Sequence, residues 1–180
     1  AGQRYEQFGY SGPAPLFVSI WHPWSSASTQ RIPLTWRELR HRALSGPLKK
    51  TYDELLLRMD SSLIEYDIRY PINSDEPIDC GPGGPSAVKE ALLDLPTHGV
   101  RAPMEGKSAR PVIVYHHGSQ GLSDENLWMA EYFASRGYVF VTANFHWPLE
   151  HAMYGTPLVW RPDAASVSTL IELARSLSTT

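Results

Sequence analysis

One short run near the middle of the chain constrains the fold more than any other feature. Four apolar residues, Val112-Ile113-Val114-Tyr115, lead directly into the segment His116-His117-Gly118-Ser119-Gln120-Gly121. A run of apolar residues without polar alternation is typical of a strand that is covered on both faces in a parallel sheet. Because parallel strands require crossover connections, usually helices, the run predicts an α/β fold.

The residues after this run supply the other parts of such a fold. We expect a helix over residues 123–136, closed by Gly137 at the position where a positive φ costs little. A second buried strand is predicted at residues 138–143, and Pro162-Asp163 opens another helix. The apolar face of that helix would carry Val167, Leu170, Ile171, Ala174 and Leu177. The order strand, helix, strand, helix predicts parallel strands joined by right-handed crossovers.

The first 35 residues predict an antiparallel hairpin that opens the domain. Its two β-prone runs, residues 4–10 and 16–21, are separated by Ser11-Gly12-Pro13-Ala14, which suits a turn of four to five residues. Residues 36–110 are interpreted as a helical insertion and connector, and residues 111–180 as the strand, loop, helix, strand and helix described above.

Three helices are expected within the insertion. Thr35 and Glu38 form a capping-box pattern for a helix that runs to about residue 44 and stops at Ser45-Gly46-Pro47. Thr51 and Glu54 repeat the pattern for a second helix, and Ser86 precedes a third. Between the last two, a period of two suggests a short strand through Ile64, Tyr66, Ile68 and Tyr70.

Composition excludes several classes of partner. The 16 Lys and Arg against 19 Asp and Glu give a net charge of −3 without a basic stripe, so we expect no nucleic acid. No stretch approaches the roughly 18 apolar residues of a transmembrane segment. The single cysteine, Cys80, excludes an internal disulfide or a CxxC pair. The start Ala1-Gly2-Gln3 suits a processed secreted or periplasmic protein as well as a cytoplasmic one, so the compartment stays unknown.

The sequence contains no pattern for a metal or a nucleotide, and no cofactor is expected. The seven histidines offer only an adjacent pair and His146 with His151, and HExxH is absent. The segment Gly106-Lys107-Ser108 is similar to the end of a P-loop. Arg101, however, stands where that motif needs glycine, and the segment precedes a strand instead of following one.

The central strand with its His-Gly-x-x-Gly continuation resembles the third strand of an α/β-hydrolase. The following run from Leu127 through Ala134-Ser135-Arg136-Gly137-Tyr138-Val139 is similar to that superfamily's first helix and fourth strand. Val18-Ser19-Ile20-Trp21-His22-Pro23 matches the opening pattern of the dienelactone-hydrolase-like and platelet-activating-factor-acetylhydrolase-like branch. The similarity covers about residues 17–23 and 110–148.

The resemblance implies a serine hydrolase that cleaves small-molecule or lipid carboxylic esters or related acyl bonds. Gly118 would allow the sharp turn that points the backbone N–H of Ser119 at the oxyanion of a tetrahedral intermediate. His117, Gly118, Gln120 and Trp147 are expected to line the cleft. A tight turn without a catalytic role stays open, as does Ser119 itself as nucleophile, although Gly118-Ser119-Gln120-Gly121 is not G-x-S-x-G.

In that family the nucleophile lies on the strand after the helix at residues 163–177, and no G-x-S-x-G occurs in this sequence. We therefore expect a single incomplete α/β-hydrolase domain over residues 1–180, with the catalytic triad outside this chain. The strand at residues 112–115 would then leave an apolar edge open. A complementary C-terminal chain, a truncated chain and self-association through that edge are the alternatives. The rival function is a non-catalytic hydrolase-fold protein that binds a partner.

Overall fold

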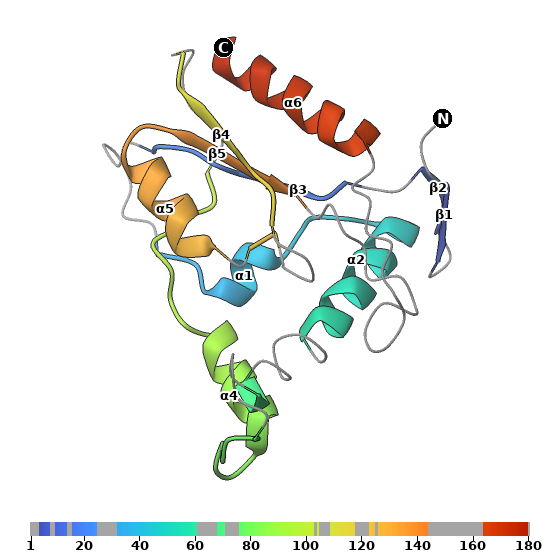
Figure 1. The fold of residues 1–180 in the computed structure, drawn as a ribbon, viewed down its shortest axis with the longest axis vertical. Helices are drawn as coiled ribbons and strands as arrows, with labels where there is room; N and C mark the ends of the chain where they lie inside the picture. The colour runs from blue at the N-terminus through green and yellow to red at the C-terminus, as the bar shows by residue number, and fades with distance from the viewer. Residues whose placement is uncertain are drawn as a thin grey trace.

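The computed structural model describes residues 4–7, 10–13, 16–24, 32–60, 68–70, 76–102, 104, 109–117, 123–124, 126–143 and 164–179. Within them the chain has mixed α/β content, as predicted: a three-stranded mixed sheet, a separate two-stranded hairpin and five helices. Figure 1 shows the sheet between helices on both of its faces, and the insertion lies at one end of the molecule.

The central strand of the sheet is β5 (Val139–Ala143), and all five of its residues are buried. It lies between β3 (Val18–Trp21) and β4 (Val112–Tyr115), so that the strand order is β3-β5-β4. Ile113 of β4 pairs with Phe140 in parallel, and Val18 of β3 pairs with Ala143 in antiparallel fashion. The parallel pair with a helix between its strands confirms the predicted crossover unit.

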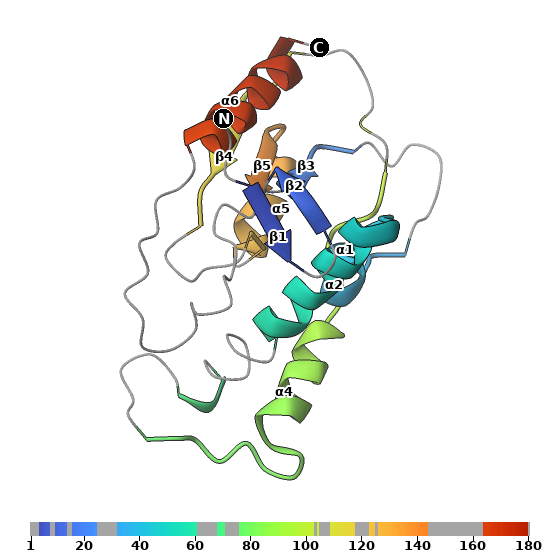
Figure 2. The same cartoon turned by 90° about the vertical axis from the view of Figure 1, so that its right-hand side faces the viewer.

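The alternation of side chains along β5 sends successive residues to two different helices. Val139, Val141 and Ala143 form a cluster with Leu170 of α6 (Ala164–Thr179). On the other face, the ring of Phe140 stacks on Phe133 of α5 (Leu127–Ser135), with centroids 6.3 Å apart. Figures 1 and 2 place α6 and α5 on opposite sides of the sheet.

Burial of β4 differs from the prediction of a strand covered on both faces. Val114 on the α6 side is 39% exposed, and β4 pairs with a strand on one side only within the described part of the chain. The reason is its place at the end of the strand order, where α6 covers only part of its face. The continuous apolar run therefore marks an edge strand here, and β5 is the strand that is fully covered.

The predicted opening hairpin is wrong in its pairing. β1 (Arg4–Gln7) pairs with β2 (Tyr10–Pro13) in a two-stranded sheet, and the run at residues 16–21 contributes β3 to the main sheet instead. The hairpin closes at the Gln7–Tyr10 pair, so it needs no partner from residues 16–21. β3 carries apolar side chains on both faces, which its position beside β5 allows to pack against both layers.

The helices of the insertion begin and end differently from the prediction. The capping box of α1 (Trp36–Arg40) is present, because Thr35 and Glu38 each donate a backbone N–H to the other's side chain. The helix nevertheless ends at Arg40, since His41 has extended backbone angles. α2 (Gly46–Met59) starts where a stop was predicted, because Pro47 fits the first helical turn.

Other parts of the insertion also differ from the helices and the strand that the sequence predicted. Thr51 does not cap a helix but lies fully buried inside α2. α4 (Gly84–Leu93) is confirmed, although it starts two residues before Ser86. Ile68 and Arg69 have helical backbone, which contradicts the short strand predicted there, and residues 64–67 of that strand lie outside the described residues. Among the described helices, none combines the length and apolarity needed to cross a bilayer.

Truncation of one α6 leucine tests how much the sheet depends on that helix. Leu170 is 1% exposed in the β5 cluster, so Leu170→Ala should lower the free energy of unfolding by about 2–5 kcal/mol. The matched control is Leu57→Ala on α2, where the side chain is 60% exposed and the loss should be small. Urea unfolding of both variants measures the difference, and equal losses would contradict the packing of α6.

Candidate functional site

The carboxyl end of β4 is where the sequence placed the catalytic loop. The His117 side chain is 1% exposed there, and the rings of His116 and His117 stack with centroids 5.6 Å apart. Nδ1 of His116 lies 2.7 Å from the carbonyl oxygen of His117. Gly118, Ser119 and Gln120 lie outside the described residues, as does Trp147, so their predicted roles stay predictions. Burial of His117 agrees with a histidine packed under a turn.

The chain beyond that loop is held at Ser123 and Asp124, directly before α5. The hydroxyl of Thr142 on β5 donates to the carbonyl oxygen of Ser123 at 2.8 Å. One carboxylate oxygen of Asp124 accepts from Trp36 Nε1 at 2.8 Å and pairs with Arg40 Nε at 2.9 Å. The segment after the loop is therefore fastened both to the central strand and to the insertion.

Arg40 is the centre of a buried ion network. Its side chain is 7% exposed, and its Nη1 atom pairs with Asp60 Oδ1 at 2.6 Å in addition to the bond with Asp124. The guanidinium also lies over the ring of Trp36, 5.5 Å from the centroid. Burial acts to lower the pKa of Arg40, but the two carboxylates outweigh it and raise the pKa above its ordinary value. The guanidinium therefore stays charged.

Tyr52 of α2 also contacts this network, through the backbone of Arg40. Its hydroxyl donates to the carbonyl oxygen of Arg40 at 2.8 Å, and its side chain is 5% exposed. Burial raises the pKa of Tyr52 above its usual value, although the nearby Arg42 opposes the shift. The phenol is therefore a neutral donor at any ordinary pH, which suits a structural hydrogen bond.

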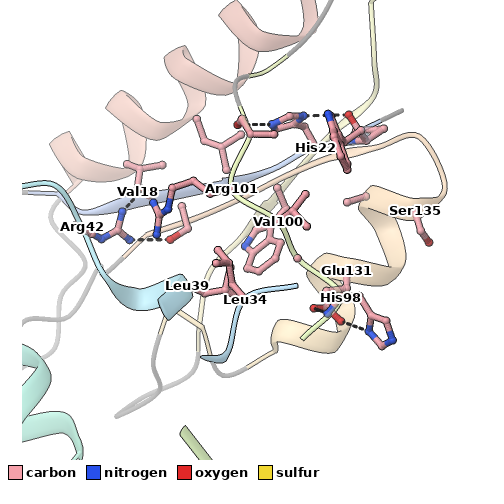
Figure 3. A pocket seen from close by; sticks show the side chains of 18 residues that line it. Val18, His22, Leu34, Leu39, Arg42, His98, Val100, Arg101, Glu131 and Ser135 are labelled. Carbon is pink, nitrogen blue, oxygen red and sulfur yellow. Dashed lines mark hydrogen bonds and ion pairs between the residues drawn. The ribbon is translucent and has the colours of Figure 1, made fainter. Parts of the chain in front are cut away.

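A second feature of the molecule is a cavity of about 430 Å³ that lies along β3. Figure 3 shows its walls, which come from β3, from the start of the insertion, from the segment at residues 98–102 and from α5. The volume falls within the range of small-molecule sites, roughly 300–1,000 Å³. None of the described residues at the end of β4 lines this cavity.

Gly99 holds the wall of the cavity against the sheet. A Cβ at this position would lie 2.9 Å from Cζ3 of Trp21 and 3.3 Å from Cδ2 of Leu39. The backbone there is fixed by the N–H of Leu34, which donates to the carbonyl oxygen of Gly99 at 2.9 Å. Only a residue without a side chain permits so close an approach to the Trp21 ring.

The polar groups of the cavity come from distant parts of the sequence. Glu131 on α5 accepts the backbone N–H of His98 at 2.8 Å, and its second oxygen lies 2.9 Å from His98 Nδ1. The ring of His22 lies between the carbonyl oxygens of Pro23 and Ala102, at 3.0 and 3.4 Å. Arg42 and Arg101 add two guanidinium groups to the lining.

Comparison with known family models, curated proteins and solved structures finds no match for this chain. Within the described residues, no three His, Cys, Asp or Glu side chains gather where they could hold a metal ion. A functional assignment therefore has to be argued from the residues themselves.

Sequence reasoning missed both the ion network and the cavity. Trp36 and Arg40 are four residues apart on a helix with a predicted cap, so their shared face could have been anticipated. Their partner Asp124 could not, because 84 positions separate it from Arg40 and no local pattern connects them. The pair His98 and Glu131 is similarly 33 positions apart.

Removal of the Asp124 carboxylate tests the ion network. Asp124→Ala leaves a buried guanidinium with one of its two carboxylates and frees Trp36 Nε1, so the free energy of unfolding should fall by about 3–5 kcal/mol. Asp94→Ala is the matched control, because Asp94 also pairs with an arginine but is 63% exposed, and its loss should matter little. Urea unfolding compares the two, and similar losses would contradict a structural role for Asp124.

Proposed function

We propose that this chain forms the oxyanion-loop half of a serine hydrolase that cleaves carboxylic esters or related acyl bonds. The observation that carries the proposal is the β4-α5-β5 unit. Because β4 and β5 are parallel neighbours, the segment after β4 leaves the sheet at its carboxyl end. That end is where open α/β sheets bind their ligands, usually through the loops that follow the strands.

The residues of the loop after β4 would have the separate roles that the resemblance implies. The backbone N–H of Ser119 donates to the oxyanion, a contribution of about 3–4 kcal/mol to transition-state binding. Gly118, Gln120 and Trp147 line the cleft for the ester, whereas His117, which is buried, supports the turn from within. The bonds of Ser123 and Asp124 to Thr142, Trp36 and Arg40 support this role, because a preorganised donor must be held rigidly.

The nucleophile, the acid and the histidine would come from another polypeptide segment. The 180 residues contain no G-x-S-x-G, and β4 pairs on one side only within the described residues. A complementary chain whose nucleophile strand lies beside β4 would supply the serine and cover this edge. The serine would attack the ester to form an acyl-enzyme, which water then hydrolyses.

The alternative, a non-catalytic hydrolase-fold protein that binds a partner or ligand, is favoured by a separate observation. The 430 Å³ cavity along β3 is lined by none of the described residues at the end of β4. A chain with a formed cavity there could bind without any ester chemistry.

Two substitutions at one position test the hydrolase proposal. The protein is isolated from its native cells with any polypeptide bound to it and assayed with p-nitrophenyl acetate. Ser119→Pro removes the N–H donor and should lower kcat by about 10²- to 10³-fold. Ser119→Ala is the matched control, because it keeps that N–H and should retain activity.

A fluorophosphonate label distinguishes the possible outcomes of this assay. The label should attach to a serine in G-x-S-x-G of the bound polypeptide and should leave the 180-residue chain unlabelled. If the isolated chain hydrolyses the ester and Ser119→Ala abolishes this activity, Ser119 is the nucleophile. That result would overturn the proposal that a second polypeptide supplies the serine. A native complex that neither hydrolyses the ester nor takes the label would overturn the hydrolase proposal and favour the binding protein.

A further inference from the structure

We propose that the cavity along β3 binds a small organic carboxylate with a flat apolar body, and that Arg42 binds the carboxylate group. The proposal does not depend on ester hydrolysis, because the cavity is separate from the described end of β4. Three properties of the lining carry it: the position of Arg42, the balance of charge, and the aromatic and aliphatic wall.

Arg42 is the group at the cavity wall that is placed to bind an anion. Its Nη1 and Nη2 atoms donate to the carbonyl oxygen of Val18 and to the hydroxyl of Ser19, both at 2.7 Å. No carboxylate of the described residues pairs with it, whereas Arg37 and Arg40 each pair with two. Each terminal nitrogen carries two hydrogens, so these two bonds leave further N–H donors on the guanidinium, which also interacts with the Tyr52 hydroxyl, and Nε is buried without a partner.

The other side chains keep Arg42 in place. Its guanidinium lies over the rings of Tyr52 and Phe17, 5.3 and 6.0 Å from their centroids. Together with the bonds to β3, these contacts fix the orientation of the planar, forked guanidinium group of Arg42 before a ligand binds. A preorganised fork loses little entropy when it binds an anion, and its geometry matches a carboxylate.

The balance of charge in the cavity favours a monoanion. Two guanidinium groups, Arg42 and Arg101, line it together with one carboxylate, Glu131. Both oxygens of Glu131 already accept from His98. Figure 3 shows Arg42 at one end of the cavity and the pair His98 and Glu131 at the other, so the two charges do not neutralise each other. The single guanidinium of Arg42 at its end of the cavity suits a singly charged carboxylate better than a doubly charged phosphate.

The remaining wall is apolar and includes a large flat ring. The indole of Trp21 lies against Gly99, and Leu34, Leu39 and Val100 complete this side of the cavity. A planar hydrocarbon ring can stack on an indole and remove apolar surface from water, while its carboxylate reaches Arg42. The cavity therefore combines an anchor for charge with an apolar wall, as small-ligand sites do.

The probe for this proposal is 2-naphthoate, and its neutral control is 2-naphthamide, which has the same rings. Isothermal titration of the full chain should show binding of 2-naphthoate that weakens with added salt. The amide should bind about 10- to 100-fold more weakly, because it lacks the charge-assisted bond to Arg42. Arg42→Gln should weaken 2-naphthoate by a similar factor, and Arg175→Gln on α6, which removes the same charge far from the cavity, should not.

A second pair of variants tests the place of binding without altering Arg42. Ser135 lines the cavity on the last turn of α5, and its hydroxyl donates to the carbonyl oxygen of Tyr132 at 2.7 Å. Ser135→Phe should fill the rim and abolish binding. Ser176→Phe on α6 is the matched control, because Ser176 makes the same type of bond to Leu173 at 2.7 Å and does not line the cavity.

Each outcome decides the proposal. Tighter binding of 2-naphthoate than of 2-naphthamide, lost in Ser135→Phe and retained in Ser176→Phe, supports it even if Arg42→Gln fails to fold. Equal binding of the acid and the amide, binding that survives in Ser135→Phe, or no binding at millimolar concentration would overturn it. None of these results depends on the ester assay, so failure of the hydrolase proposal leaves this test intact.

Discussion

The complete burial of β5 is the constraint on which the rest of the fold depends. Its five residues have partners on both edges and both faces, so every neighbouring element takes its position from this strand. Even its one polar side chain, Thr142, is used to hold Ser123 through the hydroxyl. A short strand can organise the domain in this way because a period of two assigns successive side chains to α6 and α5 without conflict.

The insertion packs on the rest of the domain through an apolar cluster around Phe17 and Tyr52, and a few charged contacts add to it. Arg40 and Trp36 reach from α1 to Asp124, and Tyr52 of α2 binds the carbonyl oxygen of Arg40. Buried ion pairs add little net stability, because desolvation offsets the attraction, but they fix geometry closely when every partner is present. The network therefore holds the chain at Asp124, shortly before α5 begins.

The sequence predicted the elements of this fold better than their partners. The capping box at Thr35, the positive φ of Gly137 and the crossover from β4 to β5 depend on residues close in sequence, and all three are confirmed. Pairing of β3 with β5 joins residues more than 100 positions apart, and local pattern favoured the nearer hairpin instead. The candidate sites were likewise hard to predict, because they join residues far apart in sequence. The contacts of Arg40 and the walls of the cavity exist only once the sheet has formed.

The two edges of the sheet have different physical requirements. At the β3 edge, Arg42 donates to the carbonyl oxygen of Val18, and the strand and residues 98–102 together line the cavity. A charged side chain bonded to the backbone discourages another strand from pairing there. At the β4 edge, the strand pairs with β5 on one side only within the described residues. The β3 edge is thus suited to a small ligand and the β4 edge to a further strand, which is why we assign binding of a carboxylate and completion of the sheet to opposite sides of β5.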